Sequence, residues 1–119
     1  MPTVAIIGAS SARHKYGNKA VRAYQRQGWT VYPVNPNEPV VEGLPTFARV
    51  TDIPGPIDRV ALYVPPAIGE TLLDEFAAKG IKELYVNPGA ESDLLLERAE
   101  SLGLGPIAAC AIVEIGERP

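Results

Sequence analysis

Short runs of apolar residues alternate along the chain with longer segments that show a helical period. Continuous aliphatic runs are typical of parallel strands that are buried on both faces of a sheet. Apolar residues three and four positions apart are typical of amphipathic helices. The pattern predicts strands over residues 3–8, 30–34, 58–64, 82–87 and 106–113. It predicts helices over residues 18–27, 65–80 and 91–103.

Glycines mark the ends of the predicted helices. Gly28, Gly80 and Gly103 each follow a periodic segment and precede a strand, where glycine accepts the left-handed conformation that closes a helix. Residues 40–56 are irregular, with a short strand or turn at 44–47 and a short helix near Val50. In the segment 65–80, five apolar residues are expected on one buried face: Ile68, Leu72, Leu73, Phe76 and Ala77.

Alternating strands and helices predict an α/β fold with an open, doubly wound, mostly parallel sheet and helices on both faces. The 119 residues are expected to form a single domain, 1–119. No apolar run approaches the roughly 20 residues that a membrane span needs, and the first residues lack a secretory signal. Cys110 is the single cysteine, so no internal disulfide is expected. These features predict a cytoplasmic protein without membrane association.

Charge is unevenly distributed along the chain. Residues 1–37 contain five basic side chains and no acidic one, whereas all 14 acidic residues follow from Glu38 onward. A cationic segment in an otherwise acidic protein favours binding of a small polyanion. Part of the cationic segment is equally well explained as the solvated face of a helix. Arg13 and Lys15, which lie in a predicted loop, are the better candidates for anion contact. An acidic body disfavours nucleic-acid binding.

In a parallel sheet the strands all end at one edge, and ligands bind outside that edge where the strand order reverses. The strand exits here read GASS, VNPN, VPP and NPG. Any one of these loops has the composition of an ordinary turn. Four of them on one edge, with the cationic loop among them, favour a binding site.

The first of these loops is suited to an anion. Gly8 permits a sharp turn, and Ser10 and Ser11 offer N–H and hydroxyl donors. A helix start near Gly17 adds further N–H groups and a positive dipole end. Nicotinamide dinucleotides are disfavoured, because the loop has one glycine of the three in the fingerprint and Val34-Asn35-Pro36 lacks the ribose-binding acid.

The motifs VAIIGAS…KYG, VYPVNP, GLPTF…DIP, DRVALYVPP and NPG occur in order from Thr3 to about Glu114. In this order they resemble the small CoA-binding protein family and the N-terminal, CoA-binding domain of the succinyl-CoA synthetase α subunit. The resemblance implies a Rossmann-like domain that binds coenzyme A, or an acyl-CoA, through its ADP portion.

The resemblance also implies roles for individual residues. Three residues would line the phosphate loop, namely Gly8, Ala9 and Ser10. A lysine-tyrosine-glycine element would close that loop, namely Lys15, Tyr16 and Gly17. Asn35 and Pro36 form the asparagine-proline turn beside the nucleotide, and Val64 and Pro65 form the apolar exit loop against the adenine. Two residues stand where relatives often carry a glutamine and a glycine, namely Asn87 and Gly89.

One departure from the family pattern affects the phosphate contacts. Relatives often place a lysine just after the asparagine-proline turn, where this chain has Asn37-Glu38. A charge contact is therefore lost or is supplied by Arg13. The phosphohistidine of the synthetases belongs to a domain outside the matched segment.

The leading hypothesis is a non-catalytic module that binds CoA or acyl-CoA as a sensor, carrier or partner subunit. No catalytic constellation and no metal site is found, since His14 is the single histidine and Cys110 is predicted within a strand. Two alternatives stay open: an enzyme component, either NAD(P)-dependent or of acyl-CoA ligase type with a separate partner, and an interaction domain that has lost its ligand. A homodimer or an unknown protein partner is compatible with either.

Overall fold

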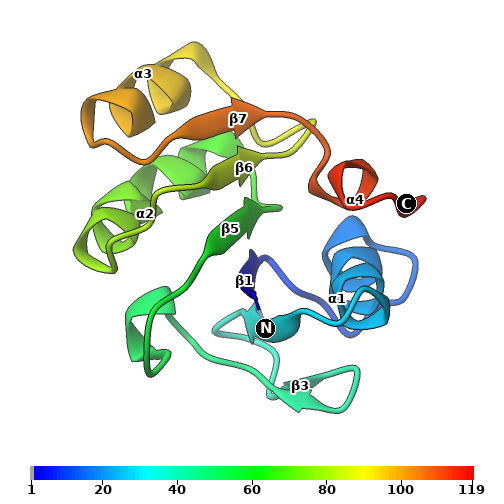
Figure 1. Ribbon diagram of the computed structural model, residues 1–119. Helices are drawn as coiled ribbons and strands as arrows, with labels where there is room; N and C mark the ends of the chain where they lie inside the picture. The colour runs from blue at the N-terminus through cyan, green and yellow to red at the C-terminus, as the bar shows by residue number, and fades with distance from the viewer. Residues whose placement is uncertain (1) are drawn as a thin grey trace.

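The computed structural model describes residues 2–119 and contains a five-stranded parallel sheet with helices on both faces (Figure 1). The strands of this sheet are β1 (Thr3–Ile7), β2 (Thr30–Val34), β5 (Arg59–Leu62), β6 (Leu84–Val86) and β7 (Pro106–Ala108). The helices are α1 (Tyr16–Arg26), α2 (Pro66–Ala78), α3 (Asp93–Ser101), α4 (Ala111–Glu114) and the 3-10 turn η1 (Val50–Asp52). A small antiparallel hairpin pairs β3 (Val40–Val41) with β4 (Leu44–Pro45).

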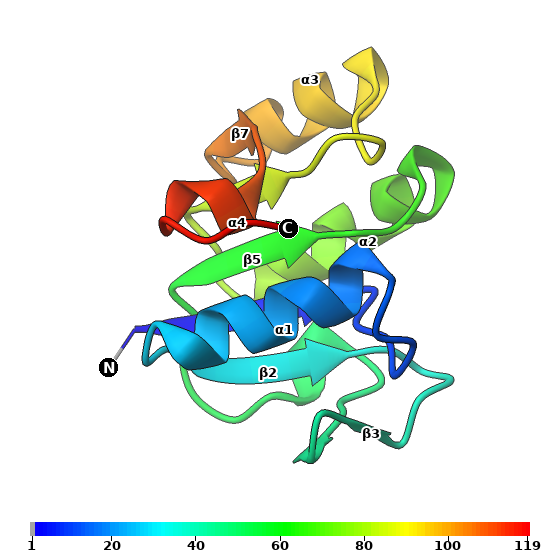
Figure 2. The same cartoon turned by 90° about the vertical axis from the view of Figure 1, so that its right-hand side faces the viewer.

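The strand order is β2-β1-β5-β6-β7, and each neighbouring pair is parallel. Along the chain, β2 is added on one side of β1. The chain then crosses to the other side of β1, where β5, β6 and β7 are added in turn. The order therefore reverses between β1 and β5, which is the point where doubly wound folds bind ligands. Figure 2 shows β2 and β5 pointing the same way, with the connecting loops at their carboxyl ends gathered on one side.

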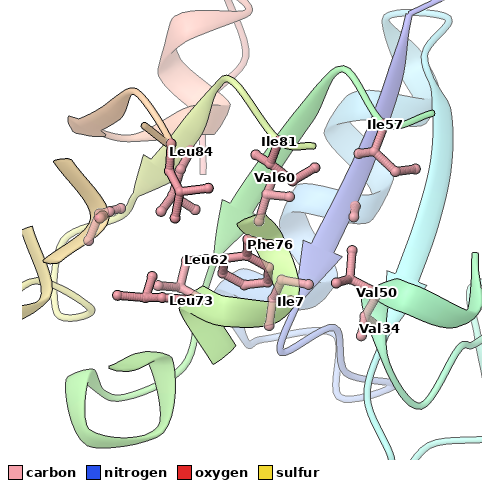
Figure 3. Packing of buried hydrophobic residues seen from close by; sticks show 14 of the residues in the cluster. Ile7, Val34, Val50, Ile57, Val60, Leu62, Leu73, Phe76, Ile81 and Leu84 are labelled. Atoms are coloured by element: carbon pink, nitrogen blue, oxygen red, sulfur yellow. The ribbon is translucent and has the colours of Figure 1, made fainter. Parts of the chain in front are cut away.

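Apolar side chains bury both faces of the sheet. Alternate residues of β1 belong to two different clusters of buried apolar side chains, one on each face of the sheet. Ile7 packs with α2 and α3, whereas Ile6 packs with α1 and α4. On the α2 face, Leu62 of β5 packs with Leu73 and Phe76 (Figure 3). Because successive side chains of a strand point to opposite faces, covering both faces requires continuous apolar strands. The predicted α/β fold is confirmed.

The helix ends agree with the glycine pattern. Gly28, Gly80 and Gly103 have φ values of 81°, 79° and 73°, each just beyond the last turn of a helix. The short helix expected near Val50 is η1. Within residues 2–119, no helix has both the length and the apolar character required to cross a membrane.

The prediction of the last strand, 106–113, is wrong over more than half of its length. β7 ends at Ala108, and Cys110 precedes α4 instead of lying in the sheet. Ala111 leaves the strand direction because its N–H donates to the Asn87 side chain (2.8 Å) and its carbonyl accepts from the Tyr24 hydroxyl (2.9 Å). The buried residues Ala111 and Ile112 therefore pack against α1.

Ile68 was expected on the buried face of α2, and it is 50% exposed. The helix meets the sheet through Gly69, Leu73 and Phe76 instead. A Cβ on Gly69 would lie 3.0 Å from the Leu62 side chain, so this glycine lets α2 pack closely. That contact rotates the preceding position away from the core, because adjacent helical residues lie about 100° apart around the axis.

Candidate functional site

A cavity of about 1040 Å³ lies at the carboxyl ends of the strands, beside the switch point between β1 and β5. Ten of the residues expected at a site line it together: Gly8, Ser10, Lys15, Tyr16, Gly17, Asn35, Val64, Pro65, Asn87 and Gly89. Four others do not line it: Ala9, Ser11, Arg13 and Pro36. Its volume is in the range of small-molecule and cofactor sites.

Gly8 allows the chain to turn sharply out of β1. Its φ is +89°, and its N–H donates to the Val34 carbonyl at 3.0 Å. A Cβ at this position would lie 2.8 Å from the Tyr63 carbonyl oxygen and 3.0 Å from a Val64 methyl group. Glycine is therefore required both by the backbone conformation and by the approach of the β5 exit.

Gly17 lets the start of α1 pack directly on the first loop. A Cβ on Gly17 would lie 2.2 Å from the Gly8 carbonyl oxygen and 3.3 Å from the Ala9 Cα. The first turn of α1 contains no acidic residue, and the Lys15 N-cap makes no side-chain capping hydrogen bond. Free N–H groups and the positive end of the helix dipole favour an anion at such a terminus. The sequence analysis placed this glycine near the start of the helix but did not identify the close packing of the helix on the Gly8 loop.

Asn18 anchors the first loop from within α1. Its side chain is fully buried, and its Nδ2 donates to the Ser10 carbonyl (2.9 Å) and to Glu42 Oε2 (3.0 Å). This hydrogen bond from Asn18 is the main reason that the pKa of Glu42 lies below its ordinary value. Glu42 also accepts from Arg13 at 3.3 Å. Arg13 thus pairs within the protein and does not face the cavity.

Glu42 occupies an unusual backbone position. It has a φ of 48° in the two-residue turn between β3 and β4, followed by Gly43 at 78°. Two left-handed residues in succession are typical of a hairpin turn whose twist matches the strands, but the first is usually Asn, Asp or Gly. The contacts of the Glu42 carboxylate with Asn18 and Arg13 tie this hairpin to the first loop. No sequence signal connected this hairpin to the site.

Asn35 shapes the exit of β2 with its own amide. Its Nδ2 donates to the Ala9 carbonyl at 2.8 Å, and its Oδ1 accepts from the Asn37 N–H at 2.8 Å. Its backbone N–H donates to the Phe47 carbonyl at 2.9 Å. Asn35 therefore fixes the distance between the loops after β1 and β2, whereas Pro36 is exposed and does not line the cavity.

Ser11 and Glu38 connect the same two loops by charge-assisted hydrogen bonds. The Ser11 N–H donates to Glu38 Oε2 at 2.6 Å, and the Ser11 hydroxyl lies 3.0 Å from both carboxylate oxygens. These bonds, led by the backbone N–H, lower the pKa of Glu38. Both Ser11 donors expected for a phosphate are thus engaged with a carboxylate. Ser10 Oγ accepts from the Ala12 N–H at 3.0 Å.

The other half of the cavity is mostly apolar. Val64 and Pro65 follow β5, and Pro88 and Ala90 follow β6. Asn87 is buried between them, where its Nδ2 donates to the Leu62 carbonyl (3.0 Å) and its Oδ1 accepts from the Ala111 N–H (2.8 Å). These bonds hold the start of α4 against the sheet. An apolar wall of this kind suits a flat or extended organic group.

Cys110 and Tyr63 also line the cavity. Desolvation raises the pKa of the Tyr63 hydroxyl, which has no hydrogen-bond partner within residues 2–119. Cys110 is partly buried at the N-terminus of α4, where the sequence analysis had expected a strand. The two halves together give the cavity anion donors at one end and an apolar wall at the other.

A doubly wound parallel sheet with a glycine loop and a helix N-terminus at its switch point defines the Rossmann-like class of folds. A family model described as "CoA binding domain" matches residues 2–116. The chain belongs to this CoA-binding domain family. The expected resemblance to the small CoA-binding protein family, with its domain of the type found in the succinyl-CoA synthetase α subunit, is confirmed.

Known relatives place the domain within larger enzymes. The chain is 34% identical over 84 residues to the subunit alpha of ADP-forming acetate–CoA ligase II from Pyrococcus furiosus, covering 70% of this chain and 18% of that relative. It is 37% identical over 82 residues to ADP-forming acetate–CoA ligase II of Archaeoglobus fulgidus, covering 67% of this chain and 12% of that relative. The chain therefore spans less than a fifth of these curated relatives.

Solved structures share the fold over most of the chain. A conserved hypothetical protein of Pyrococcus furiosus has a TM-score of 0.87 and 33% identity, covering 96% of this chain and 99% of the other. The dinucleotide-forming acetyl-coenzyme A synthetase 1 of Ca. Korarchaeum cryptofilum, solved in complex with phosphate and ADP, has a TM-score of 0.79 and 27% identity. That match covers 90% of this chain and 25% of the synthetase.

Proposed function

We propose that the chain binds coenzyme A or an acyl-CoA through its ADP portion, in the cavity at the carboxyl ends of the strands. It acts as a non-catalytic binding module, such as a sensor or a partner subunit. The observation that supports this most directly is the close packing of Gly17 on the Gly8 loop beside the uncapped start of α1. Membership of the CoA-binding domain family supports the same ligand.

The two halves of the cavity match the two chemical characters of this ligand. The pyrophosphate would lie at the Gly8–Ser10 loop and the start of α1, where backbone N–H groups and the Lys15 ammonium can balance its charge. The adenine would lie against Val64 and Pro65. The apolar wall after β6 would accept the less polar remainder of the ligand.

The proposal is tested by isothermal titration calorimetry of the ligand-stripped protein against CoA, with NAD and ATP as comparison ligands. We expect CoA to bind most tightly. Lys15→Ala should weaken CoA binding by about tenfold, because the contact of an exposed lysine lies at the low end of the range of about 1.5–3 kcal/mol for charge-assisted hydrogen bonds. Lys82→Ala is the matched control, since Lys82 is an exposed lysine just before β6, at the amino end of the strands.

Two results would contradict the proposal. Tighter binding of NAD than of CoA would show that the glycines missing from the dinucleotide fingerprint were given too much weight. No heat with any ligand, supported by a second binding method, would favour an interaction domain that has lost its ligand.

A second candidate function is that of a component of an ADP-forming acyl-CoA ligase. The relatives that carry this activity in their names favour it, and this chain matches a small part of each. Such a component would need its remaining domains from elsewhere. Co-purification with a nucleotide-binding ligase subunit, followed by CoA-dependent acyl transfer in the mixture, would support this role; inactivity of the mixture would argue against it.

A further inference from the structure

Glu38 belongs to the candidate nucleotide site, and its carboxylate contacts the first loop. It lines the cavity and accepts from both the backbone N–H and the hydroxyl of Ser11. Glu38 follows β2, and Ser11 follows β1, so this contact joins the exits of two neighbouring strands. A short backbone bond of 2.6 Å with hydroxyl contacts to both carboxylate oxygens holds the carboxylate in one position.

The exit of β2 is where doubly wound folds meet the ribose of a bound adenine nucleotide. The pyrophosphate of such a ligand sits at the N-terminus of the first helix, and an acid or a base near the end of the second strand meets the ribose 2′-hydroxyl or 2′-phosphate, beside the 3′ position. In this chain the corresponding first helix is α1 and the second strand is β2. Glu38 is therefore placed to face the ribose.

The charges around the cavity do not favour a second phosphate group. Among the described residues that line it, Lys15 and Glu38 bear opposite formal charges, with His14 counted as neutral. Lys15 lies close enough to contribute to the lowered pKa of Glu38. Arg13, the cation that could replace a missing phosphate contact, is paired with Glu42. The site thus offers one ammonium group, already offset by a carboxylate.

A ribose hydroxyl and a ribose phosphate would meet Glu38 differently. A hydroxyl can donate a hydrogen bond to the carboxylate. A phosphate monoester brings about −1.5 to −2 further charge and has acceptor oxygens that cannot bond to a carboxylate. Like charges brought together at a binding interface are strongly unfavourable.

We infer that Glu38 makes this site select, among CoA-type ligands, those whose ribose hydroxyls are free over those that carry a 3′-phosphate. The inference rests on the proposed function, because it concerns the ribose end of the same ligand. It assigns a preference for 3′-dephospho-CoA over CoA, two compounds that differ by the 3′-phosphate alone.

The experiment compares the affinities of 3′-dephospho-CoA and CoA for three forms of the protein by isothermal titration calorimetry: wild type, Glu38→Gln and Glu38→Lys. The wild type should bind 3′-dephospho-CoA at least about tenfold more tightly. Glu38→Gln should bring the two affinities within about threefold of each other, and Glu38→Lys should reverse the order. Glu97→Lys, an exposed change of the same charge on α3, should keep the wild-type preference.

The outcomes separate the inference from the proposed function. If the wild type binds CoA as tightly as 3′-dephospho-CoA, or if Glu38→Gln leaves the ratio unchanged, the inference is wrong while CoA-type binding stands. If neither compound binds to any form, although thermal melting shows that each is folded, the proposed function fails and the inference with it. An equal shift in Glu97→Lys would attribute the effect to net charge and would also overturn the role of Glu38.

Discussion

Replacing Gly17 by alanine tests whether the close packing of α1 on the first loop builds the binding site. The added Cβ would lie 2.2 Å from the Gly8 carbonyl oxygen, about 1.2 Å short of an ordinary contact of 3.4 Å. The Gly8 oxygen belongs to the backbone and cannot rotate away, so either the loop or the helix start must move. Overpacking of this kind costs about 1–3 kcal/mol. The better helix propensity of alanine offsets about 1 kcal/mol, which leaves a net loss of about 0–2 kcal/mol in stability.

The expected effect on binding is larger than the effect on stability. A shift of this size removes the alignment of the α1 N–H groups with a phosphate. Losing one charge-assisted hydrogen bond, worth about 1.5–3 kcal/mol, weakens binding by about ten- to a hundredfold. Titration of Gly17→Ala with CoA measures the affinity, and urea unfolding followed by circular dichroism measures the stability.

Gly69→Ala is the matched control, because it makes the same change inside α2. Its Cβ would meet Leu95 Cδ1 at 2.9 Å and Leu62 Cδ2 at 3.0 Å, which are the ends of side chains that can rotate. We expect its CoA affinity to equal that of the wild type, with stability changed by about 1 kcal/mol or less. Wild-type affinity in Gly17→Ala would refute the reasoning, as would an equal loss of affinity in Gly69→Ala.

Three further predictions concern packing and pH. Tyr24→Phe leaves the buried Ala111 carbonyl without the Tyr24 donor and removes one of the acceptors of Arg59, which still bonds to Glu83 and Glu114. It should lower the free energy of unfolding in urea by about 1–3 kcal/mol; an unchanged midpoint and slope would contradict this. Asn87→Ala removes two buried hydrogen bonds and should destabilise the protein by about 2–3 kcal/mol. It should also weaken CoA binding. Wild-type stability and wild-type affinity together would show that α4 does not need the Asn87 side chain to hold it in place. Because the folded state lowers the pKa of Glu38 below its ordinary value of 4.5, its contribution to stability is complete above about pH 4.5 and is lost as the pH falls through the lowered value. Unfolding measured from pH 3 to pH 6 should therefore depend less on pH in Glu38→Gln than in the wild type, and identical pH profiles would rule out this contribution.

The fold could be predicted because its main signals are local. Continuous apolar runs identify strands with two buried faces, and the glycines at 28, 80 and 103 mark helix ends whatever lies around them. The order of elements then restricts the topology to a parallel sheet with right-handed crossovers. The same reasoning located the strand exits, so the position of a cleft followed from the sequence even though its shape did not.

Tertiary contacts determine the two features that the sequence did not predict, namely the end of β7 and the bonding of Ser11 to Glu38. The apolar run after Pro106 suits a strand or a buried helix equally well, and the bond from Ala111 to Asn87 is what ends β7 and starts α4. The contact between Ser11 and Glu38 joins residues 27 positions apart, so no local pattern reveals it. A loop donor that looks free in the sequence is engaged once the chain folds.

The uneven distribution of charge along the sequence is partly evened out by ion pairs in the folded protein. Acidic residues from the later part of the chain return to the basic N-terminal segment, as Glu42 does to Arg13 at 3.3 Å and Glu117 to Arg26 at 2.8 Å. Part of the positive field that a polyanion could use, that of Arg13 and Arg26, is therefore neutralised internally. Attraction of a phosphate then depends mainly on backbone N–H groups at the first loop and at the start of α1. Since side-chain truncation leaves backbone donors in place, substitutions at Gly8 and Gly17 should affect the site more than removal of any single basic side chain.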